Sequence, residues 1–303
     1  MGYVIFTAVI CAGVLFYFYE RRMRYREIDR LLDCVLNQEE ITGSEMKEGE
    51  FSALVGKIGR IRRMMERQVE CAKEEKEQVK SLVSDMSHQL KTPLAGLSIY
   101  ADILGEGRLD EERMREVTWK MKKQVEKLDW IIGSLGKMVK LEQDAIAFET
   151  EELFIRQTIS DAVDAVYEKM EKKGIHIISE PYEDVLLLHN RKWTAEVFVN
   201  ILENAVKYTK QGGMVRIKVT PFELYTQIQF IDNGCGICKE EIPHIFKRFY
   251  RGKDAQNVEG AGIGLYLSNL ILEKEKGYMT VKAVHGQGSC FSVFLRNGGM
   301  SRI

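Results

Sequence analysis

Two long series of apolar residues at helical spacing constrain the fold of this chain more than any other feature. The gaps within the first series are 3, 4, 4, 3, 4 and 3 residues, along Val83, Met86, Leu90, Leu94, Leu97, Ala101 and Leu104. The gaps within the second are 4, 4, 3, 4, 3 and 4 residues, along Val117, Met121, Val125, Leu128, Ile132, Leu135 and Val139. Two helices alone cannot enclose two such seams, so the pattern predicts an all-α dimeric four-helix bundle with two helices per protomer. The segment 105–112 between them, GEGRLDEE, supplies a turn and an acidic helix start.

From about residue 150 the periodicity changes. Helical patterns are expected at 153–172, 193–209 and 265–275. They alternate with short β-like runs at 175–179, 185–189, 215–220, 226–232, 278–284 and 289–295. This alternation predicts a C-terminal α/β sandwich with helices on one face of a mixed sheet.

The N-terminus carries an uncharged run, 3–19 (YVIFTAVICAGVLFYFY), followed at once by the basic segment ERRMRYR at 20–26. A run of this length lies at the lower end of what spans a hydrocarbon core, and the arginines after it favour a cytoplasmic body. A signal peptide is the alternative, but it requires basic residues before the run and a small-residue cleavage site after it. We therefore expect a single-pass protein of the cell membrane, with its catalytic body in the cytoplasm and two residues outside.

Residues 20–75 read as a cytoplasmic helical linker. An amphipathic helix at 27–38 and a second helix from Phe51 flank a polar connector that contains Gly43 and Gly49. This order resembles a HAMP-type signal relay, and an amphipathic spacer without a defined relay is an equally open alternative.

The charge balance excludes one class of partner. Lysine plus arginine number 44 and aspartate plus glutamate 45, so no global field favours nucleic acid. The six cysteines are scattered, and only Cys235 and Cys238 have a suggestive CxxC spacing. A single pair does not supply a tetrahedral zinc site, and the pair lies within a glycine-containing loop, so regulation by oxidation is only one open alternative for it.

One histidine stands out in the first apolar series, in SDMSHQLKTPL at 84–94. His88 lies two residues from both Met86 and Leu90, so it points about 200° away from each and faces solvent. Pro93 lacks an N–H and crowds the carbonyl of Gln89, so we expect the helix to bend or open locally there. An exposed imidazole beside a helix irregularity is accessible to a reagent that another domain or molecule delivers. The alternative is an ordinary surface histidine of a coiled coil.

Three downstream segments have the chemistry of a nucleotide site. FVNILENAVKYT (198–209) places Asn200, Asn204 and Lys207 on one helix face, where amide oxygens suit Mg²⁺ and an ammonium suits phosphate. IDNGCGI (231–237) puts an aspartate after a strand and before glycines that permit close approach of a ligand. GAGIGL (260–265) is a glycine-rich loop that opens a helix, where backbone N–H groups attract phosphate.

The histidine segment and these elements, in this order over residues 80–296, resemble a sensor histidine kinase with a Bergerat-type ATP-binding domain. The resemblance implies His88 as phosphoacceptor, with Gln89 and Thr92 beside it as catalytic positions. It implies ATP and Mg²⁺ as cofactors. The implied cofactor-binding residues are Asn200, Asn204, Lys207, Tyr208, Asp232, Gly234, Gly236, Phe246, Arg248, Phe249, Arg251, Gly260, Gly262 and Gly264.

Individual roles follow from the same resemblance. Asn204 is the expected Mg²⁺ ligand, with Asn200 in its water network, and Lys207 a phosphate contact. Asp232 is expected to accept from the adenine amine, beside Tyr208.

The remaining positions shape the site. Gly234 and Gly236 are expected to form the pocket floor, and Phe246 and Phe249 to anchor a lid over ATP. Either Arg248 or Arg251 is expected to reach the γ-phosphate, and the glycines of 260–264 to cradle the phosphates.

The chain departs from the resemblance at one position. The family commonly has an acidic residue after the histidine, proposed as the base that takes the imidazole proton, and here Gln89 occupies it. A glutamine cannot ionise, but it accepts hydrogen bonds, and imidazole is largely neutral near pH 7. We expect slower autophosphorylation. Thr92 matches the residue that orients water in the family's phosphatase reaction, so both activities are expected, unequally preserved.

The expected organisation has four parts: a transmembrane helix at 3–19, the linker at 20–75, a dimerisation and phosphotransfer domain at 76–145, and a catalytic ATP-binding domain at 150–296. The expected partners are a second copy of the chain, a response regulator that receives the phosphoryl group on an aspartate, and a membrane protein such as a transporter. A non-kinase ATPase of the same superfamily and a pseudokinase scaffold are the alternatives.

Overall fold

The computed structural model describes residues 2–36, 50–107, 109–143, 148–252 and 260–299. The chain divides into two compact units, Met1–Ser84 and Asp85–Ile303. Helix α2 (Glu50–Gly105) begins in the first unit and ends in the second.

The first unit contains α1 (Gly2–Leu36), which is one uninterrupted helix. It therefore joins the apolar run at 3–19 to the part of the amphipathic pattern at 27–38 that the structure describes, up to Leu36, and we had expected this pattern as a separate helix. The connector with Gly43 and Gly49 lies outside the described residues. Large apolar side chains of the run, such as Phe6 and Leu15, are exposed. Among the residues described, no helix combines the length and apolar character that crossing a bilayer requires.

A helical hairpin opens the second unit. It consists of the end of α2 and of α3 (Glu111–Glu142). Asp110 caps α3, because its Oδ1 accepts a hydrogen bond from the backbone N–H of Arg113 at 2.8 Å, and Glu111 and Glu112 lie in the first turn. A carboxylate cap and acidic first-turn residues both favour a helix start. The predicted turn and acidic helix start are thus confirmed.

Helix α2 passes through Pro93 without interruption, so the predicted local opening is wrong, and the alternative of a bend stays a prediction. The pyrrolidine ring is buried, and the neighbouring Thr92 hydroxyl donates to the carbonyl of His88 at 3.5 Å. The long helix on both sides of the proline keeps the backbone helical despite the missing N–H donor. The imidazole of His88 is exposed, as predicted.

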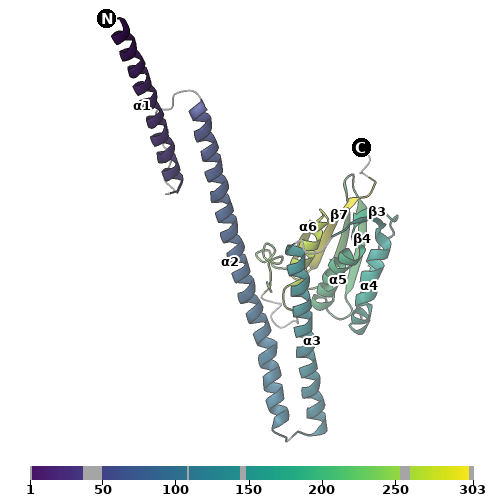
Figure 1. The fold of residues 1–303 in the computed structure, drawn as a ribbon. Helices are drawn as coiled ribbons and strands as arrows, with labels where there is room; N and C mark the ends of the chain where they lie inside the picture. Colours follow the sequence, from purple (N-terminus) through teal and green to yellow (C-terminus); the bar gives the residue numbers. More distant parts are fainter. Residues whose placement is uncertain (1, 37–49, 108, 144–147, 253–259, 300–303) are drawn as a thin grey trace. The chain divides into compact units, whose positions relative to one another are not determined.

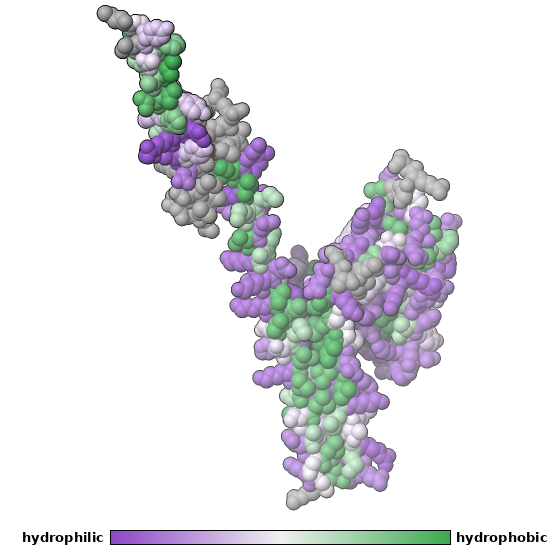
Figure 2. All heavy atoms as spheres, viewed as in Figure 1, coloured by the Kyte–Doolittle hydropathy of each residue, from purple (hydrophilic) through white to green (hydrophobic). Residues whose placement is uncertain are grey.

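The hairpin leaves much of its apolar seam uncovered. Leu94, Val125 and Ile132 are 54%, 46% and 58% exposed, and Figure 2 shows apolar surface running along both helices. The other side of α3 is fully buried at Ile131 and Met138, which the seam pattern had not singled out. Helix α3 therefore has two apolar faces, and one of them packs against helix α6 (Gly264–Lys274) of the α/β domain.

The α/β domain follows the hairpin. Its other elements are β1 (Glu151–Phe154), α4 (Ile155–Lys172), β2 (His176–Ser179), β3 (Leu186–His189), α5 (Arg191–Tyr208), β4 (Met214–Pro221), β5 (Tyr225–Asp232), β6 (Tyr278–Val284) and β7 (Gly288–Asn297). The described strands form one sheet in the order β1-β3-β7-β5-β4-β2, and β6 pairs with β7. Strand β2 is parallel to β4, whereas the other described pairs are antiparallel, so the predicted mixed sheet is confirmed.

The core lies between the sheet and helices α4, α5 and α6, which Figure 1 shows on one face of the sheet. Burial alternates along β4 and β5, as expected for a sheet with one covered face. The rings of Phe198 on α5 and Phe230 on β5 lie 5.1 Å apart, centroid to centroid, and both are buried. This packing fixes the opposite face of α5, where the polar residues of the predicted nucleotide site lie.

Candidate functional site

A cavity of the second unit collects most of the predicted nucleotide-binding residues. Ten of them line it: Asn200, Asn204, Lys207, Tyr208, Asp232, Gly236, Arg251, Gly260, Gly262 and Gly264. Gly234, Phe246, Arg248 and Phe249 do not. The predicted catalytic positions His88, Gln89 and Thr92 lie on α2, outside the cavity lining.

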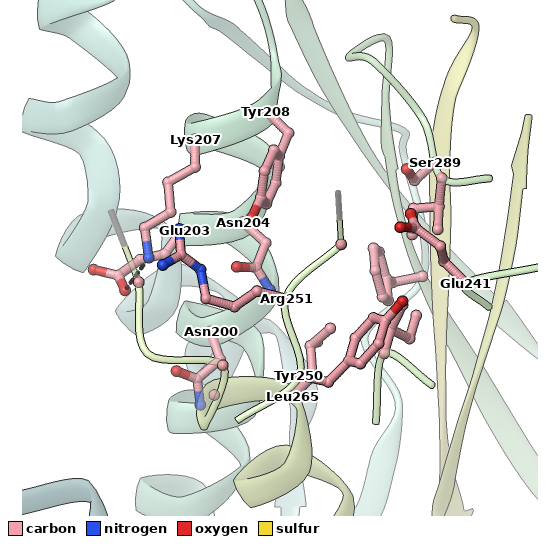
Figure 3. Close-up of a pocket in the computed structure, with 18 of the residues that line it drawn as sticks. Asn200, Glu203, Asn204, Lys207, Tyr208, Glu241, Tyr250, Arg251, Leu265 and Ser289 are labelled. Carbon is pink, nitrogen blue, oxygen red and sulfur yellow. Dashed lines mark ion pairs between the residues drawn. The ribbon is translucent and has the colours of Figure 1, made fainter. Parts of the chain in front are cut away.

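Helix α5 supplies the polar wall. Its apolar face is buried in the core at Phe198, Ile201, Leu202 and Ala205. Asn200, Asn204 and Lys207 recur at i, i+4 and i+7 and therefore share the opposite face. Figure 3 shows the side chains of Asn204 and Lys207 in the same region as Arg251, which comes from the loop after Phe249.

Glu203 belongs to the same wall, although the sequence analysis did not single it out. It lines the cavity, its Oε2 lies 4.0 Å from Nζ of Lys207, and its Oε1 pairs with Lys169. The signal was available, because i+3 shares a helix face with i and i+4. The same cavity wall therefore contains a carboxylate as well as the amide groups of Asn200 and Asn204.

Asn200 ties this wall to helix α6. Its Nδ2 donates to Oγ of Ser268 at 3.3 Å, and the hydroxyl of Ser268 donates to the carbonyl of Gly264 at 2.9 Å. Asn200 is only 8% exposed, so its amide is held in one orientation. The start of α6 is thereby fixed beside the middle of α5.

The glycine-rich loop forms the rim next to α6. Gly260, Ala261, Gly262 and Gly264 line the cavity, and the N-cap residue Ile263 gives no side-chain hydrogen bond to the first turn. Gly262 has φ of +71°, and a Cβ there would lie 2.5 Å from the carbonyl oxygen of Tyr250. Only glycine fits this conformation and this contact. The first-turn N–H groups of α6 therefore lack a side-chain cap at a rim suited to anions.

Asp232 lies at the other end of the cavity, at the end of β5. Its Oδ1 accepts hydrogen bonds from the backbone N–H groups of Gly234 at 2.9 Å and Ser289 at 3.3 Å. Burial raises the pKa of this carboxyl group above its ordinary value, and the backbone hydrogen bonds oppose that shift. The Asp232 side chain is thus fixed among apolar lining residues that include Ile237 and Phe291.

The two arginines predicted to reach the γ-phosphate, Arg248 and Arg251, lie in different places. Arg251 lines the cavity. Arg248 instead lies against α3: its Nη1 is 3.8 Å from Oε1 of Glu142, and its guanidinium lies over the ring of Tyr266 at 5.5 Å. The hydroxyl of Tyr266 donates to the same Glu142 oxygen at 2.7 Å. Of the two, only Arg251 lines the cavity, and its contact with the γ-phosphate stays a prediction.

Further lining residues come from distant parts of the chain. They are Trp130, Glu241, Ile245, Tyr250, Leu265 and Ser289. Figure 3 shows Ser289 and Glu241 across the cavity from Lys207. Leu265 ends the glycine-rich segment 260–265 and lies on α6. No local pattern marks the other five, because folding brings them to the cavity from α3, β7 and the segment before α6.

The oxygen donors of the cavity fit a magnesium ion that takes only one or two ligands from the protein and the others from phosphates and water. Among the described residues, no group of three or more His, Cys, Asp or Glu side chains can hold a metal ion. The cavity nevertheless has oxygen donors at Asn204 and Glu203, and Mg²⁺ is commonly held by one or two protein oxygens together with phosphates and water.

The cavity thus has one end with a fixed carboxylate and apolar walls, and another with amide, lysine and arginine side chains and backbone N–H groups that the Ile263 side chain does not cap. The first end suits a flat base with an exocyclic amine, and the second suits a polyphosphate. A nucleoside triphosphate matches both ends.

Two family models match the helical hairpin and the α/β domain. Residues 78–144 match the His Kinase A (phospho-acceptor) domain, and residues 189–298 match the histidine kinase-, DNA gyrase B- and HSP90-like ATPase. The chain therefore combines a phospho-acceptor domain with an ATPase domain, which is the domain set of a histidine kinase.

Individual relatives are sensor kinases. The chain is 28% identical over 225 residues to the sensor histidine kinase RppB of Synechocystis, covering 72% of this chain and 49% of that protein. It is 28% identical over 221 residues to the sensor protein kinase WalK of Staphylococcus aureus, covering 71% of this chain and 52% of that protein. The chain spans about half the length of these curated relatives.

A solved structure shares the fold. The histidine kinase ThkA, in complex with the response regulator protein TrrA, superposes with a TM-score of 0.63 at 16% identity, covering 78% of this chain and 67% of that one. At this identity the likeness concerns the fold alone.

Proposed function

We propose that this protein is a sensor histidine kinase that binds ATP in the cavity, phosphorylates His88, and passes the phosphoryl group to an aspartate of a response regulator. The observation that supports the proposal is the cavity, which is lined by Asn204, Lys207, Arg251 and the glycine-rich start of α6. The helical hairpin of the same chain exposes His88. Phosphoryl transfer needs mostly positioning and charge neutralisation, which such a lining supplies.

The binding roles follow from the two ends of the cavity. Asp232 accepts a hydrogen bond from the exocyclic amine of adenine, and Tyr208 lies beside the base. Lys207, Arg251 and the N–H groups of the loop 260–264 bind the phosphates. Asn204 supplies an oxygen ligand to Mg²⁺, with Asn200 in its water network. The bound ion neutralises phosphate charge during transfer.

The same hairpin serves a phosphatase reaction. Thr92 lies one helical turn after His88, and its hydroxyl reaches the His88 carbonyl. A water molecule held by this hydroxyl is positioned to hydrolyse the aspartyl phosphate of a docked regulator.

The active form is a homodimer. The exposed apolar side chains Leu94, Ile99, Val125 and Ile132 lie on the hairpin, and burying them against a second hairpin gives the four-helix bundle. Each large side chain buried this way contributes on the order of 1.5 kcal/mol or more.

The N-terminal run anchors the protein in the cell membrane, with the catalytic body in the cytoplasm. This rests on the uncharged segment 3–19, in which the described side chains are exposed, and on the arginines that follow. A membrane partner such as a transporter supplies the stimulus. Carbonate extraction of membranes tests the anchor: the parent chain is expected to stay in the pellet, and a Val9→Lys, Leu15→Lys variant to be released.

The central experiment incubates the purified chain with γ-labelled ATP and Mg²⁺. The expected product carries label that acid removes and base does not, and His88→Ala abolishes it with nucleotide affinity unchanged. Label that persists in His88→Ala, or that survives acid, would contradict the proposal. Release of phosphate without any bound label would favour the ATPase alternative, and absence of both would favour a pseudokinase scaffold.

A further inference from the structure

The two cysteines of the CGIC segment lie at the wall of the cavity, and the nucleotide-binding scheme uses neither thiol. Cys235 lines the cavity and Cys238 follows three residues later, both half-buried. The Sγ of Cys238 lies 3.5 Å from Nδ1 of His285, on the turn between β6 and β7. The pair is not part of a metal cluster among the described residues.

A thiol beside an imidazole has a defined chemistry. The imidazole nitrogen can accept the thiol proton, and the thiolate, unlike the thiol, is the nucleophile in exchange with a disulfide. Cys238 is therefore the thiol with a local base, and Cys235 is the second thiol of the segment. This assigns the attacking role to Cys238 and the resolving role to Cys235.

The backbone of Cys235 joins the segment to the site. Its N–H donates to the carbonyl of Tyr208 at 3.2 Å, and its carbonyl accepts from the N–H of Gly286 at 2.6 Å. Tyr208 itself lines the cavity. Any shift of Cys235 therefore disturbs the end of α5 on one side and the turn that carries His285 on the other.

Gly236, between the cysteines, leaves the segment little room. It has φ of +70°, and a Cβ there would lie 2.0 Å from the carbonyl oxygen of Val284. The backbone at Gly236 therefore packs closely against Val284, which limits how far it can shift when Cys235 and Cys238 are linked. We expect the link to move Cys235, and with it the cavity wall.

We propose that Cys235 and Cys238 form a thiol–disulfide exchange site, at which a low-molecular-weight disulfide oxidises the dithiol and thereby weakens nucleotide binding. The Cys238 proton passes to His285, and the thiolate attacks one sulfur of RSSR. A Cys238–S–S–R bond forms, the RSSR bond breaks, and the released RS⁻ takes up the proton as RSH. Cys235 then attacks Sγ of Cys238, which forms the internal disulfide and releases a second RSH. Two protein thiols are oxidised and one RSSR is reduced to two RSH.

Nucleotide and oxidant act against each other at this site. A nucleotide in the cavity holds the wall to which Cys235 belongs in its reduced arrangement, so it slows the second step. By linkage, the disulfide lowers nucleotide affinity by the same factor by which nucleotide disfavours the disulfide. This part rests on the proposed function, because it takes the cavity as the nucleotide site.

The experiment treats the reduced full chain with glutathione disulfide, maps the cysteines by peptide mass, and measures the Kd of Mg-ATP before and after. We expect a Cys235–Cys238 bridge, a Kd weaker by about tenfold, as loss of a hydrogen-bonded wall contact would give, and recovery on reduction. Excess Mg-ATP is expected to slow bridge formation.

Matched variants separate the steps. Cys235→Ser is expected to stop at the mixed disulfide on Cys238, and Cys238→Ser to form neither product at these positions. His285→Gln is expected to slow the first step by about tenfold or more. Cys290→Ser, which removes a thiol of β7 outside the cavity lining, is expected to behave as the parent.

Absence of the bridge in the parent would overturn the proposal, as would a bridge that leaves the Kd unchanged. A first step as fast in His285→Gln as in the parent would remove the role of the imidazole. A reduced parent that binds no nucleotide would refute the nucleotide site and the coupling, while the mass measurement would still decide the exchange chemistry.

Discussion

Oε1 of Glu275 accepts a hydrogen bond from the hydroxyl of Thr194 at 2.7 Å, and the same oxygen accepts from the backbone N–H of Asn190 at 2.9 Å. Asn190 is the N-cap of α5 and Glu275 follows the last residue of α6, so this contact joins the two helices that form the cavity walls. Glu275 is only 2% exposed, and its Oε2 has no hydrogen-bond partner among the described residues.

Burial raises the pKa of Glu275 to about 7, well above 4.5, and the two hydrogen bonds oppose the shift only in part. A raised carboxyl pKa means that the folded state prefers the protonated form. The contribution of Glu275 to the free energy of unfolding is therefore highest below pH 4.5. It falls as the pH rises from 4.5 through 7, by about 3 kcal/mol in all. Glu275→Gln is expected to flatten this slope, as measured by urea unfolding between pH 4.5 and 8. The same change at the exposed Glu273 serves as control, and equal slopes in all three proteins would contradict the assignment.

A second buried contact, at His189, predicts a pH dependence of stability opposite to that of Glu275. His189 is fully buried; its Nδ1 donates to the carbonyl of Leu187 at 3.1 Å, so its Nε2 accepts from the hydroxyl of Thr158 at 2.9 Å. Burial lowers the pKa of this imidazole. The neutral ring therefore stabilises the fold above pH 6.5, and that contribution is lost as the pH falls below it.

Thr158→Val tests the contact, because it keeps the side-chain shape and leaves Nε2 without a donor. It is expected to cost about 1–3 kcal/mol of unfolding free energy at pH 7.5. Thr158→Ser keeps the hydroxyl and is expected to cost less, so a serine variant less stable than the valine variant would argue against the hydrogen bond.

The polar face of α5 was predictable because helical periodicity alone places Asn200, Asn204 and Lys207 together. The glycine-rich start of α6 was predictable for a similar reason, since its residues are contiguous in sequence. Trp130 and Ser289 were not, because they reach the cavity only through packing of α3 and pairing of β7. Strand β1 was missed because its four residues are defined by their register with β3, Glu151 opposite His189, and not by an apolar alternation of their own.

Asp232→Asn is expected to weaken Mg-ATP binding by about 1.5–3 kcal/mol, because an amide replaces a charged acceptor for the adenine amine. The amide oxygen can still accept from the N–H groups of Gly234 and Ser289, so the fold is expected to survive. Calorimetry with ATP and with inosine triphosphate, which lacks the amine, sharpens the test. The parent is expected to prefer ATP and the variant to discriminate little; an unchanged preference would show that Asp232 does not contact the base.

The two arginines form a matched pair. Arg251→Gln is expected to reduce the ratio of ATP to ADP affinity and to lower the autophosphorylation rate, because Arg251 lines the cavity and is the proposed contact of the phosphates. Arg248→Gln removes the same charge from a side chain that lies against Glu142, and is expected to leave that affinity ratio unchanged. Equal loss of the ratio in both variants would mean that Arg248 also reaches the phosphates.

The last prediction concerns Gln89, which stands where the family commonly has an acidic residue. If removal of the His88 proton limits transfer, Gln89→Glu supplies a carboxylate one residue away and should raise the autophosphorylation rate, since positioned bases contribute about 10²-fold or more. The new charge also favours the protonated imidazole, which acts in the opposite direction, but few imidazoles are protonated at pH 8. The expected gain is therefore larger at pH 8 than at pH 6, as measured by initial rates of acid-labile labelling. Gln89→Asn controls for side-chain length without adding charge. A rate at pH 8 no higher than that of the parent would show that glutamine suffices, or that another step, such as docking of the ATP-binding domain onto the hairpin, sets the rate.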